Sequence, residues 1–335
     1  LLLRNYIIII SNLIFNPDED IRQNLNLYIS YRVYSAPFFL TLLVSTGWFL
    51  GQGLVKTAIS LQVFMSLINI MLSLYLGLKI NMGVEGIAIA TTIAETFASI
   101  LALIIVFYKT HKNLPKIKTL TNKKKNILLF KANLNILIRT LLLICSISLI
   151  NSISSRMGKS VLAVNAILFH FQAFLYFGLD GFAQATEILV GKSIGEKNYT
   201  RFSNIILTSS ILAFATTLIY FLSYIIFIET IFSIFSDNQL LLEDLSKYKI
   251  WIILSPLISV FCFQLDGIYI GALQTKYMRN SMLFSFIFYI LSLYVLVPIF
   301  KNHGIWLSFI LFLMMRSITL SYYFPSLIRN SFKKE

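Results

Sequence analysis

The chain contains a succession of apolar runs, each of a length that suits a helix crossing a lipid bilayer. About 20 apolar residues make one helical span. Helix is the expected structure because lipid offers no partners to free backbone N–H and C=O groups. The sequence therefore predicts an all-α, polytopic membrane protein. Ten runs can be marked: 1–15, 29–50, 57–78, 84–108, 127–150, 161–190, 202–228, 250–273, 281–300 and 305–326.

The composition supports that class and argues against several others. Hydrophobic residues make up 57% of the chain and charged residues only 13%, whereas about a quarter of a typical soluble domain is charged. No phosphate-binding loop, dinucleotide-binding fingerprint or nucleophile motif occurs in the sequence. The two cysteines lie inside apolar runs and the three histidines lie far apart, so no disulfide framework or metal site is predicted. We expect a protein that is not an enzyme and that needs no cofactor.

The excess of positive charge also fits a membrane protein. The net charge is +14, and Lys and Arg accumulate in cytoplasmic loops. The stretch 109–126, KTHKNLPKIKTLTNKKKN, has seven lysines and no acid, so we place it in the cytoplasm. Alternation of the spans puts both chain ends in the cytoplasm as well, and the acidic loop 16–24 outside. The prediction is a multi-pass protein of the cell (inner) membrane, without a nucleic-acid partner.

Short motifs recur in the same order in two parts of the chain. Four matches keep a nearly constant offset of 218 to 220 positions, which indicates an internal repeat. Two pseudo-symmetric helical bundles are therefore predicted. The matches are GWFLG at 47–51 with GIYIG at 267–271, LSLY at 72–75 with LSLY at 291–294, Gly86-Ile87 with Gly304-Ile305, and Pro37 with Pro256.

The repeat divides the chain into unequal bundles. The first bundle spans 1–108, a basic linker spans 109–126, and the second bundle spans 127–335. The region 127–220 has no counterpart in the first bundle. We therefore interpret the chain as about ten segments of a parental twelve, with the run 1–15 as the remaining part of a cut helix. Six spans per bundle is an even number, so both bundles would have the same orientation in the membrane.

Three polar residues share one face of the run 161–190. Asp180 and Glu187 are seven positions apart, which is two helical turns, and Gln184 lies between them. Because an acid inside a membrane is costly and typically functional, we predict an interior stripe that titrates or contacts substrate. The alternative is that this part of the long run already lies at the cytoplasmic surface, and it applies above all to Glu187.

Arg139 and Asp266 are charged residues deep inside two other runs. An arginine twelve residues into its run needs a partner, and Asp180 and Asp266 are the candidates. Asp266 lies near the middle of its run beside Gly267, and Pro256 upstream can kink this helix. We predict a functional role for Asp266. For Arg139 the alternative is a fixed structural ion pair.

Glu95 is the only deep acid of the first bundle. It lies near the centre of the run 84–108, with Thr91 one turn before it on the same helical face. A buried carboxyl whose surroundings change can gain or lose a proton, so Glu95 is a candidate proton carrier. The alternative is a neutral acid that is bonded to a threonine or to the backbone.

Four longer stretches carry a family resemblance. They are GVEGIAIATTIAE at 83–95, LDGFAQATEILVGKSIGEKN at 179–198, FQLDGIYIGALQTKYMRN at 263–280 and NHGIWLSFILFLMMRSITL at 302–320. Together they resemble the multidrug and toxic compound extrusion (MATE) exporters, and look closest to the DinF-like branch. The resemblance extends over essentially the whole chain, from the family's third helix to its twelfth.

The resemblance implies a fold and an activity. The family fold is two six-helix bundles around a central cavity, which work by alternating access. Its members export cationic, amphiphilic compounds in exchange for protons or sodium. By this resemblance Arg139 falls in the seventh helix, Asp180 and Glu187 in the eighth, and Asp266 in the tenth.

The resemblance also implies a second cation site in the first half. Asn69 and Thr91 match a fifth-helix asparagine and a sixth-helix threonine of that site. Two departures remove carboxylates from it. The acid on the family's first helix is absent from this sequence, and Ser73 stands where relatives have an acid four residues after the asparagine. Glu95 would then be the remaining acid.

The expected function is a secondary antiporter, and other functions stay open. The chain could be a non-transporting fragment of such an exporter. It could also be a flippase for lipid-linked precursors of a related fold, although few arginines at mid-membrane argue against a cavity for anionic headgroups. The expected partners are small cationic or amphiphilic substrates and the lipid bilayer, and we expect a monomer.

Overall fold

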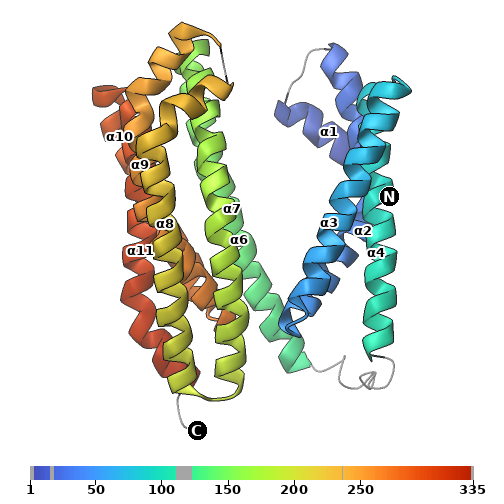
Figure 1. The fold of residues 1–335 in the computed structure, drawn as a ribbon, viewed down its shortest axis with the longest axis vertical. Helices are drawn as coiled ribbons and strands as arrows, with labels where there is room; N and C mark the ends of the chain where they lie inside the picture. Colours follow the sequence, from blue (N-terminus) through green and yellow to red (C-terminus); the bar gives the residue numbers. More distant parts are fainter. Residues whose placement is uncertain (1–3, 16–18, 111–122, 236, 333–335) are drawn as a thin grey trace. The chain divides into compact units, whose positions relative to one another are not determined.

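The computed structural model describes residues 4–15, 19–110, 123–235 and 237–332. Within these ranges the chain is built from helices, without a strand (Figure 1). It divides into two compact units, Leu1–Leu120 and Thr121–Glu335. The division falls inside the stretch predicted as the basic linker, of which residues 111–122 lie outside the described ranges.

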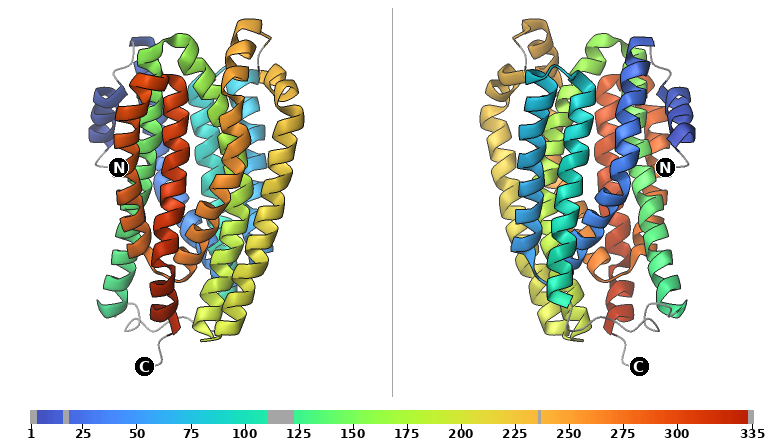
Figure 2. Two further views of the ribbon diagram at one scale, coloured as in Figure 1. Left: turned by 90° about the vertical axis from the view of Figure 1, so that its left-hand side faces the viewer. Right: turned by 90° about the vertical axis from the view of Figure 1, so that its right-hand side faces the viewer.

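The helices of the two units follow one another along the chain. The N-terminal unit holds α1 (Arg4–Phe15), α2 (Glu19–Gly51), α3 (Val55–Ser73), the π-helix η1 (Leu74–Lys79) and α4 (Gly83–Thr110). The C-terminal unit holds α6 (Lys123–Met157), α7 (Lys159–Gly195), α8 (Tyr199–Phe235), α9 (Gln239–Gly271), α10 (Thr275–Phe300) and α11 (Asn302–Phe332). Within each unit the long helices run up and down side by side (Figure 2).

Most of the predicted spans are present, and the first one differs. In the described part of the chain, nine helices are long and apolar enough to cross a membrane. The run 1–15 contains α1, which has 12 residues. At 1.5 Å per residue such a helix is about 18 Å long, short of the roughly 30 Å hydrocarbon core. The expectation of a tenth segment therefore meets a helix too short to span by itself.

Alanines shape the N-terminal unit. In this unit α2 packs against α4, and α3 and η1 pack against α4 as well. Small side chains at such an interface let helix backbones approach closely. The buried face of α4 is accordingly formed in large part by Ala88, Ala90, Ala94, Ala98 and Ala102, all fully buried.

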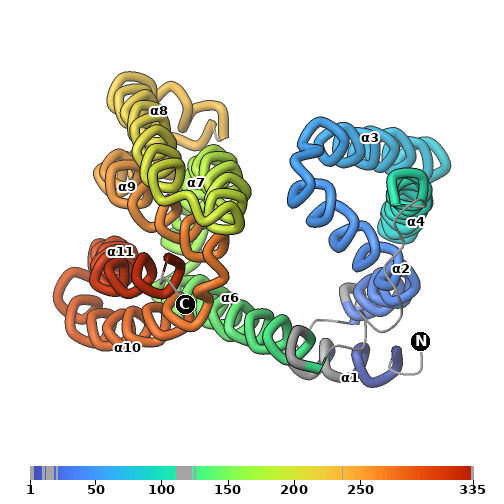
Figure 3. Tube along the Cα trace, turned by 90° about the horizontal axis from the view of Figure 1, so that it is seen from below, coloured from blue at the N-terminus to red at the C-terminus, as the bar shows by residue number. Residues whose placement is uncertain are grey.

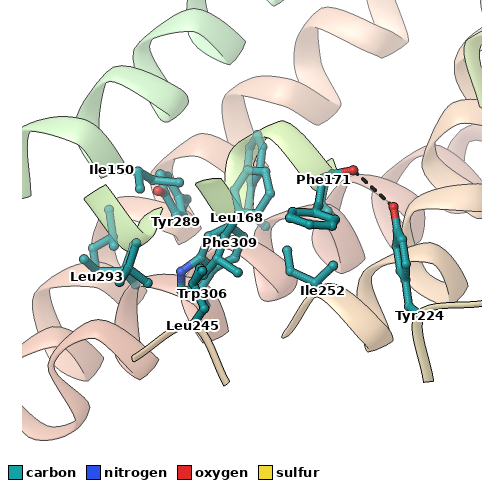
Figure 4. Packing of buried hydrophobic residues seen from close by; sticks show 14 of the residues in the cluster. Ile150, Leu168, Phe171, Tyr224, Leu245, Ile252, Tyr289, Leu293, Trp306 and Phe309 are labelled. Atoms are coloured by element: carbon teal, nitrogen blue, oxygen red, sulfur yellow. Dashed lines mark hydrogen bonds between the residues drawn. The ribbon is translucent and has the colours of Figure 1, made fainter. Parts of the chain in front are cut away.

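The C-terminal unit packs its helices in close pairs. Helix α7 packs on α9 and α10 on α11, while α8 contacts both α7 and α9; Figure 3 shows these helices end on. Large aromatic and aliphatic side chains fill the space between them (Figure 4). The hydroxyl of Tyr224 donates a hydrogen bond to the carbonyl oxygen of Phe171 at 3.3 Å, so that this buried polar group has a partner.

A buried amide network fastens one end of the C-terminal unit. Asn165 on α7 and Asn302 on α11 exchange side-chain hydrogen bonds of 2.7 and 3.1 Å. Asn165 also donates to Ser154 of α6 and accepts from the indole N–H of Trp306. Because each amide group is paired, the network joins α6, α7 and α11 without leaving a costly buried polar atom.

The outer surface of the helices is apolar. Side chains such as Val44, Phe107, Phe177 and Tyr294 are exposed, Tyr294 by 81%, whereas many buried positions carry serine, threonine, asparagine or a charged residue. This distribution suits a chain that is surrounded by lipid and gathers its polar groups inside.

Candidate functional site

Charged residues meet inside the C-terminal unit at Asp266 of α9. Its Oδ2 accepts a hydrogen bond from Nη2 of Arg316 on α11 at 2.7 Å, and the same oxygen is ion-paired with Nη2 of Arg139 on α6. Asp266 is 6% exposed and Arg316 only 4%. The predicted pairing of Arg139 with Asp266 is thus present, and it is shared with a second arginine.

Two glycines set the position of Asp266. A Cβ atom on Gly267 would lie 2.3 Å from the carbonyl oxygen of Ala183, and one on Gly271 would lie 2.5 Å from that of Glu187. Both positions therefore require glycine, which lets α9 touch the backbone of α7. This contact holds Asp266 beside the polar face of α7.

Asp180 on α7 belongs to the same group of charges. It lies close enough to Asp266, Arg139 and Arg316 to interact electrostatically with all three. Its side chain is exposed, and it has no hydrogen-bond partner within the described part of the chain. With every group ionised, two carboxylates balance two guanidinium groups. Such compensation is what charges inside a membrane require.

The sequence reasoning missed Arg316. The signal was available, because this arginine stands in the middle of the last apolar run, and an arginine at that depth needs an anion. The expectation that few arginines lie at mid-membrane is corrected as well. Arg139 and Arg316 lie within spans of the C-terminal unit, and Arg32 lies within a span of the N-terminal unit.

The other two predicted polar residues of α7 stand apart from the cluster. Glu187 is half-buried and Gln184 is exposed, and in the described ranges neither side chain has a hydrogen-bond partner. They continue the face of Asp180 along α7. The structure therefore joins Asp180 to the Asp266 cluster and leaves Glu187 and Gln184 outside it.

A buried glutamine next to the cluster connects three helices. Nε2 of Gln264 on α9 donates to Oγ of Ser209 on α8 at 2.5 Å and to Oγ1 of Thr186 on α7 at 3.2 Å. Gln264 stands two residues before Asp266, so this contact fixes α9 against α7 and α8 at the level of the charged cluster.

The N-terminal unit has its own ion pair, between a buried acid and a partly exposed arginine. Oε2 of Glu95 on α4 lies 2.7 Å from Nη1 of Arg32 on α2, which also donates to Ser35 at 3.0 Å. Glu95 is 4% exposed. The sequence leaves a threonine or the backbone as the alternative partner of Glu95, and the structure pairs it instead with an arginine of α2. Arg32 was missed, although it stands within a predicted apolar run.

Asn69 on α3 and Thr91 on α4 are also brought together in the N-terminal unit. Oδ1 of Asn69 on α3 accepts from Oγ of Ser73 at 3.0 Å and from Oγ1 of Thr91 on α4 at 3.3 Å. The serine that replaces an expected acid thus bonds to the asparagine. Neutral oxygens of this kind can contribute to a cation site. Among the described residues, no group of three or more His, Cys, Asp or Glu side chains could hold a metal ion.

Comparisons with known proteins agree with one another. A family model described as MatE matches residues 136–295. The chain is 29% identical over 327 residues to "DNA damage-inducible protein F" of Escherichia coli (strain K12), covering 96% of this chain and 70% of that protein.

Two solved structures share the fold. A crystal structure of MATE in the bent conformation superimposes with a TM-score of 0.85 at 16% identity, over 99% of this chain and 76% of that one. A MOP superfamily transporter from Pyrococcus furiosus Vc1 (DSM3638) gives a TM-score of 0.87 at 17% identity, over 99% and 75% of the two chains. With the family match and the E. coli relative, they lead to one conclusion: this chain is a multi-pass membrane protein that is similar in sequence and in fold to transporters of the MATE family.

Proposed function

We propose that this chain is a secondary active antiporter that exports cationic, amphiphilic compounds in exchange for protons or sodium. The observation that carries the proposal is the buried Asp266 carboxylate shared by Arg139 and Arg316, with Asp180 within electrostatic reach. A carboxylate in that position controls the charge balance of the whole cluster, because removing its charge leaves the two arginines facing one fewer acid.

The coupling follows from that balance. When Asp266 is neutralised, the buried Arg316 loses its ion-pair partner, and a conformation that gives the guanidinium another acceptor gains in population. When Asp266 is charged, the present arrangement is favoured. A proton or sodium ion can therefore bias an alternating-access equilibrium, as a ligand does when it binds two conformations unequally.

Asp180 is the acid that we assign to the cationic substrate. It is exposed and has no hydrogen-bond partner in the described ranges, so a cation can approach it without displacing another group. Gln184 and Glu187 continue its helical face and would extend the polar surface offered to substrate. In the N-terminal unit we assign Asn69, Thr91 and Glu95 to the remnant of a second ion site.

The placement in the membrane is part of the same proposal. Each unit exposes apolar side chains along its spans, and positive charge is concentrated in the stretch 109–126. We propose the cell (inner) membrane as the location, with that stretch and both ends of the chain in the cytoplasm. We also propose that the monomer is the working unit.

A second candidate function is the flipping of lipid-linked precursors with anionic headgroups. Two arginines in one cluster, Arg316 buried and Arg139 partly buried, favour it more than the sequence suggested. The similar P. furiosus transporter is described as having a binding pocket of reverse polarity that suggests a different function. Against this candidate, Asp266 and Asp180 already balance both arginines.

The test is transport by purified protein in liposomes. We expect a cationic dye to move against an imposed proton or sodium gradient, and Asp266→Asn to abolish the movement. Asp237→Asn, an exposed acid at the α8–α9 connection, is the matched control and should leave transport intact.

Three outcomes separate the candidates. Full-rate export by Asp266→Asn contradicts the assignment of the coupling acid. Movement of an anionic polyprenyl phosphate without any movement of cationic dye favours the flippase. Absence of both, with folded protein in the liposomes, favours a chain that does not transport by itself.

A further inference from the structure

A polar seam runs between α7 and α9, beyond the charged cluster. On α7 the residues Gln172, Tyr176 and Asp180 follow one another at four-residue spacing, and so lie on one helical face. The α9 side of the seam carries Ser255, Ser259, Cys262 and Asp266, and α7 and α9 pack against each other. We call these seven residues the α7–α9 seam.

Two buried atoms of the seam lack a partner. Nε2 of Gln172 donates to Oγ of Ser255 at 2.5 Å, and Ser255 and Ser259 lie 3.3 Å apart at their hydroxyl oxygens. In the described ranges, however, Oε1 of Gln172 and Oη of Tyr176 have no hydrogen-bond partner. Gln172 is only 1% exposed. Buried polar atoms are nearly always paired with protein or with ordered water.

The unpaired tyrosine hydroxyl stands between the amide and the charged cluster. It lies near Gln172 and Ser259 without reaching hydrogen-bond geometry with either, and Arg316 is within its electrostatic reach. Seen from Arg316, the groups within reach are Asp266, Asp180, Tyr176 and Cys262. The phenol oxygen of Tyr176 is therefore an uncharged group that can accept a hydrogen bond from the guanidinium group.

We propose that one water molecule binds between α7 and α9, hydrogen-bonded to Oε1 of Gln172 and Oη of Tyr176. This hydrated hydroxyl is the acceptor that Arg316 takes when Asp266 is neutralised. Tyr176 is thus a positioning residue for Arg316.

Water fits the site better than a cation. A buried water makes two to four hydrogen bonds and can donate to one group while it accepts from another. The amide oxygen accepts only, and the hydroxyl can do either, so water satisfies both atoms. The same oxygens could serve sodium, but the positive charge of Arg316 within reach of Tyr176 opposes a cation there.

The change of partner gives Arg316 a hydrogen-bond acceptor when Asp266 is neutral. This side chain is 4% exposed, so it cannot turn to bulk water when its carboxylate is neutralised. Arg139 would also be released, and Asp180 has to balance both guanidinium groups. A phenol oxygen supported by water gives Arg316 a hydrogen bond without a new charge. This role rests on the proposed neutralisation of Asp266, whereas the water site itself does not.

The water is tested by hydroxyl-radical footprinting of the whole protein in nanodiscs with short X-ray pulses, which form radicals from bound water as well as from bulk solvent. We expect Tyr176 to be modified many times faster than Tyr269, which is fully buried and donates to the carbonyl oxygen of Leu320 at 2.6 Å. Gln172→Leu removes one partner of the water, and should lower the Tyr176 rate to that of Tyr269. A Tyr176 rate that is equal to that of Tyr269, or unchanged by Gln172→Leu, overturns the water site.

The exchange of partners is tested by a double-mutant cycle on the melting temperature. We expect Tyr176→Phe to lower the melting temperature of the Asp266→Asn protein by several degrees more than it lowers that of the wild-type protein. Tyr224→Phe, which removes a hydroxyl bonded elsewhere in the same unit, should cost both backgrounds the same. Additive effects of Asp266→Asn and Tyr176→Phe overturn the role assigned to the tyrosine.

A second measurement covers the case in which Asp266→Asn protein does not fold. Asp266→Ser, which removes the same charge with a smaller side chain, then takes the place of Asp266→Asn, and Tyr176→Phe should again lower the melting temperature of that protein more than Tyr224→Phe does. Equal losses contradict the exchange. Loss of transport with the cycle intact would remove the antiporter proposal and leave this inference standing.

Discussion

In both units an ion pair joins corresponding helices, but the helix that carries the acid in one unit carries the base in the other. The repeat relates α2 to α9 and α4 to α11 through the motifs at 47–51 and 86–87. In the N-terminal unit Arg32 on α2 meets Glu95 on α4. In the C-terminal unit Asp266 on α9 meets Arg316 on α11. The repeated packing therefore does not dictate which helix carries the acid.

The surroundings of the two acids differ more than their partners do. Glu95 has one arginine, whose side chain is 28% exposed. Asp266 has two, and one of them is almost completely buried. Neutralising Glu95 leaves a cation that is partly exposed, whereas neutralising Asp266 leaves one that is almost completely buried. The C-terminal unit is thus the more sensitive of the two to a change of charge.

The glycines of the repeat show the same contrast. Gly86 and Gly304 behave alike, because a Cβ on either would lie 2.8 or 2.3 Å from the backbone of the preceding helix, at Leu76 and Leu296 respectively. Gly267 presses against α7, while its counterpart Gly47 has nothing within 4 Å in the described part of the chain. One glycine motif has thus kept its close contact in both units, and the other has it only in the C-terminal unit.

The largest difference is expected from exchanging the two charges of each pair. Arg32→Glu with Glu95→Arg keeps one acid and one base in contact, so most of the stability should return relative to either single change. Asp266→Arg with Arg316→Asp brings an arginine beside Arg139, and we expect loss of folded protein. Thermal unfolding of purified protein in detergent measures both. Equal recovery in the two units would contradict the shared role of Asp266.

Neutralising the acids singly should give the next largest difference. Asp266→Asn leaves two guanidinium groups short of an acid, and breaking a buried pair in this way costs about 3–5 kcal/mol. Glu95→Gln leaves a partly exposed arginine and should cost roughly half as much. Denaturation midpoints of both variants, with Asp237→Asn as the unaffected control, make the comparison. A larger loss for Glu95→Gln would reverse our ranking of the two units.

Adding one methyl group to corresponding glycines sharpens the packing comparison. Gly267→Ala forces α9 away from the Ala183 carbonyl oxygen, at a cost of about 1–3 kcal/mol from overpacking. Gly47→Ala meets open space on a helix and should be neutral, or stabilising by up to about 1 kcal/mol. Melting temperatures of the two variants decide the point, and destabilisation by Gly47→Ala would show that this face is covered in the folded protein.

The smallest effects are expected from single hydroxyl groups. Thr91→Val removes one of two donors to Asn69 and should cost well under about 1 kcal/mol. Ser209→Ala leaves the buried Gln264 with the longer bond to Thr186 only, and should cost about 1–2 kcal/mol. A reversed order of the two losses in chemical denaturation would contradict the view that the C-terminal unit holds the tighter polar network.

The fold was largely accessible from the sequence because lipid simplifies the problem. Backbone groups in a bilayer must bond within their own helix, so long apolar runs predict spans with few alternatives. The helix Arg4–Phe15 is the exception, because the apolar run 1–15 predicted a membrane segment and the described helix has only 12 residues. The repeat identified α2 and α9 as counterparts, because their matching glycines and prolines indicate corresponding helix contacts and bends.

The site was accessible in part. Arg139 and Asp266 could be paired because each is costly alone at that depth. Arg316 and Arg32 were not predicted because each stands alone near the centre or start of a strongly apolar run, without a recognisable acid partner in that run. Which acid takes which base depends on the rotation of each helix about its axis. That rotation is set by packing contacts such as Gly267 against Ala183, which a single sequence does not reveal.

The fastenings of α7 have a mechanical consequence. Asn165 anchors it to α6 and α11 near its start, and Gly267 and Gly271 seat against its backbone farther along. With contacts at both places, α7 is held against sliding along its axis relative to α9 and α11. We therefore expect a change of shape in the C-terminal unit to move α7, α9 and α11 together, so that a displacement at Asp266 also displaces the far ends of these helices.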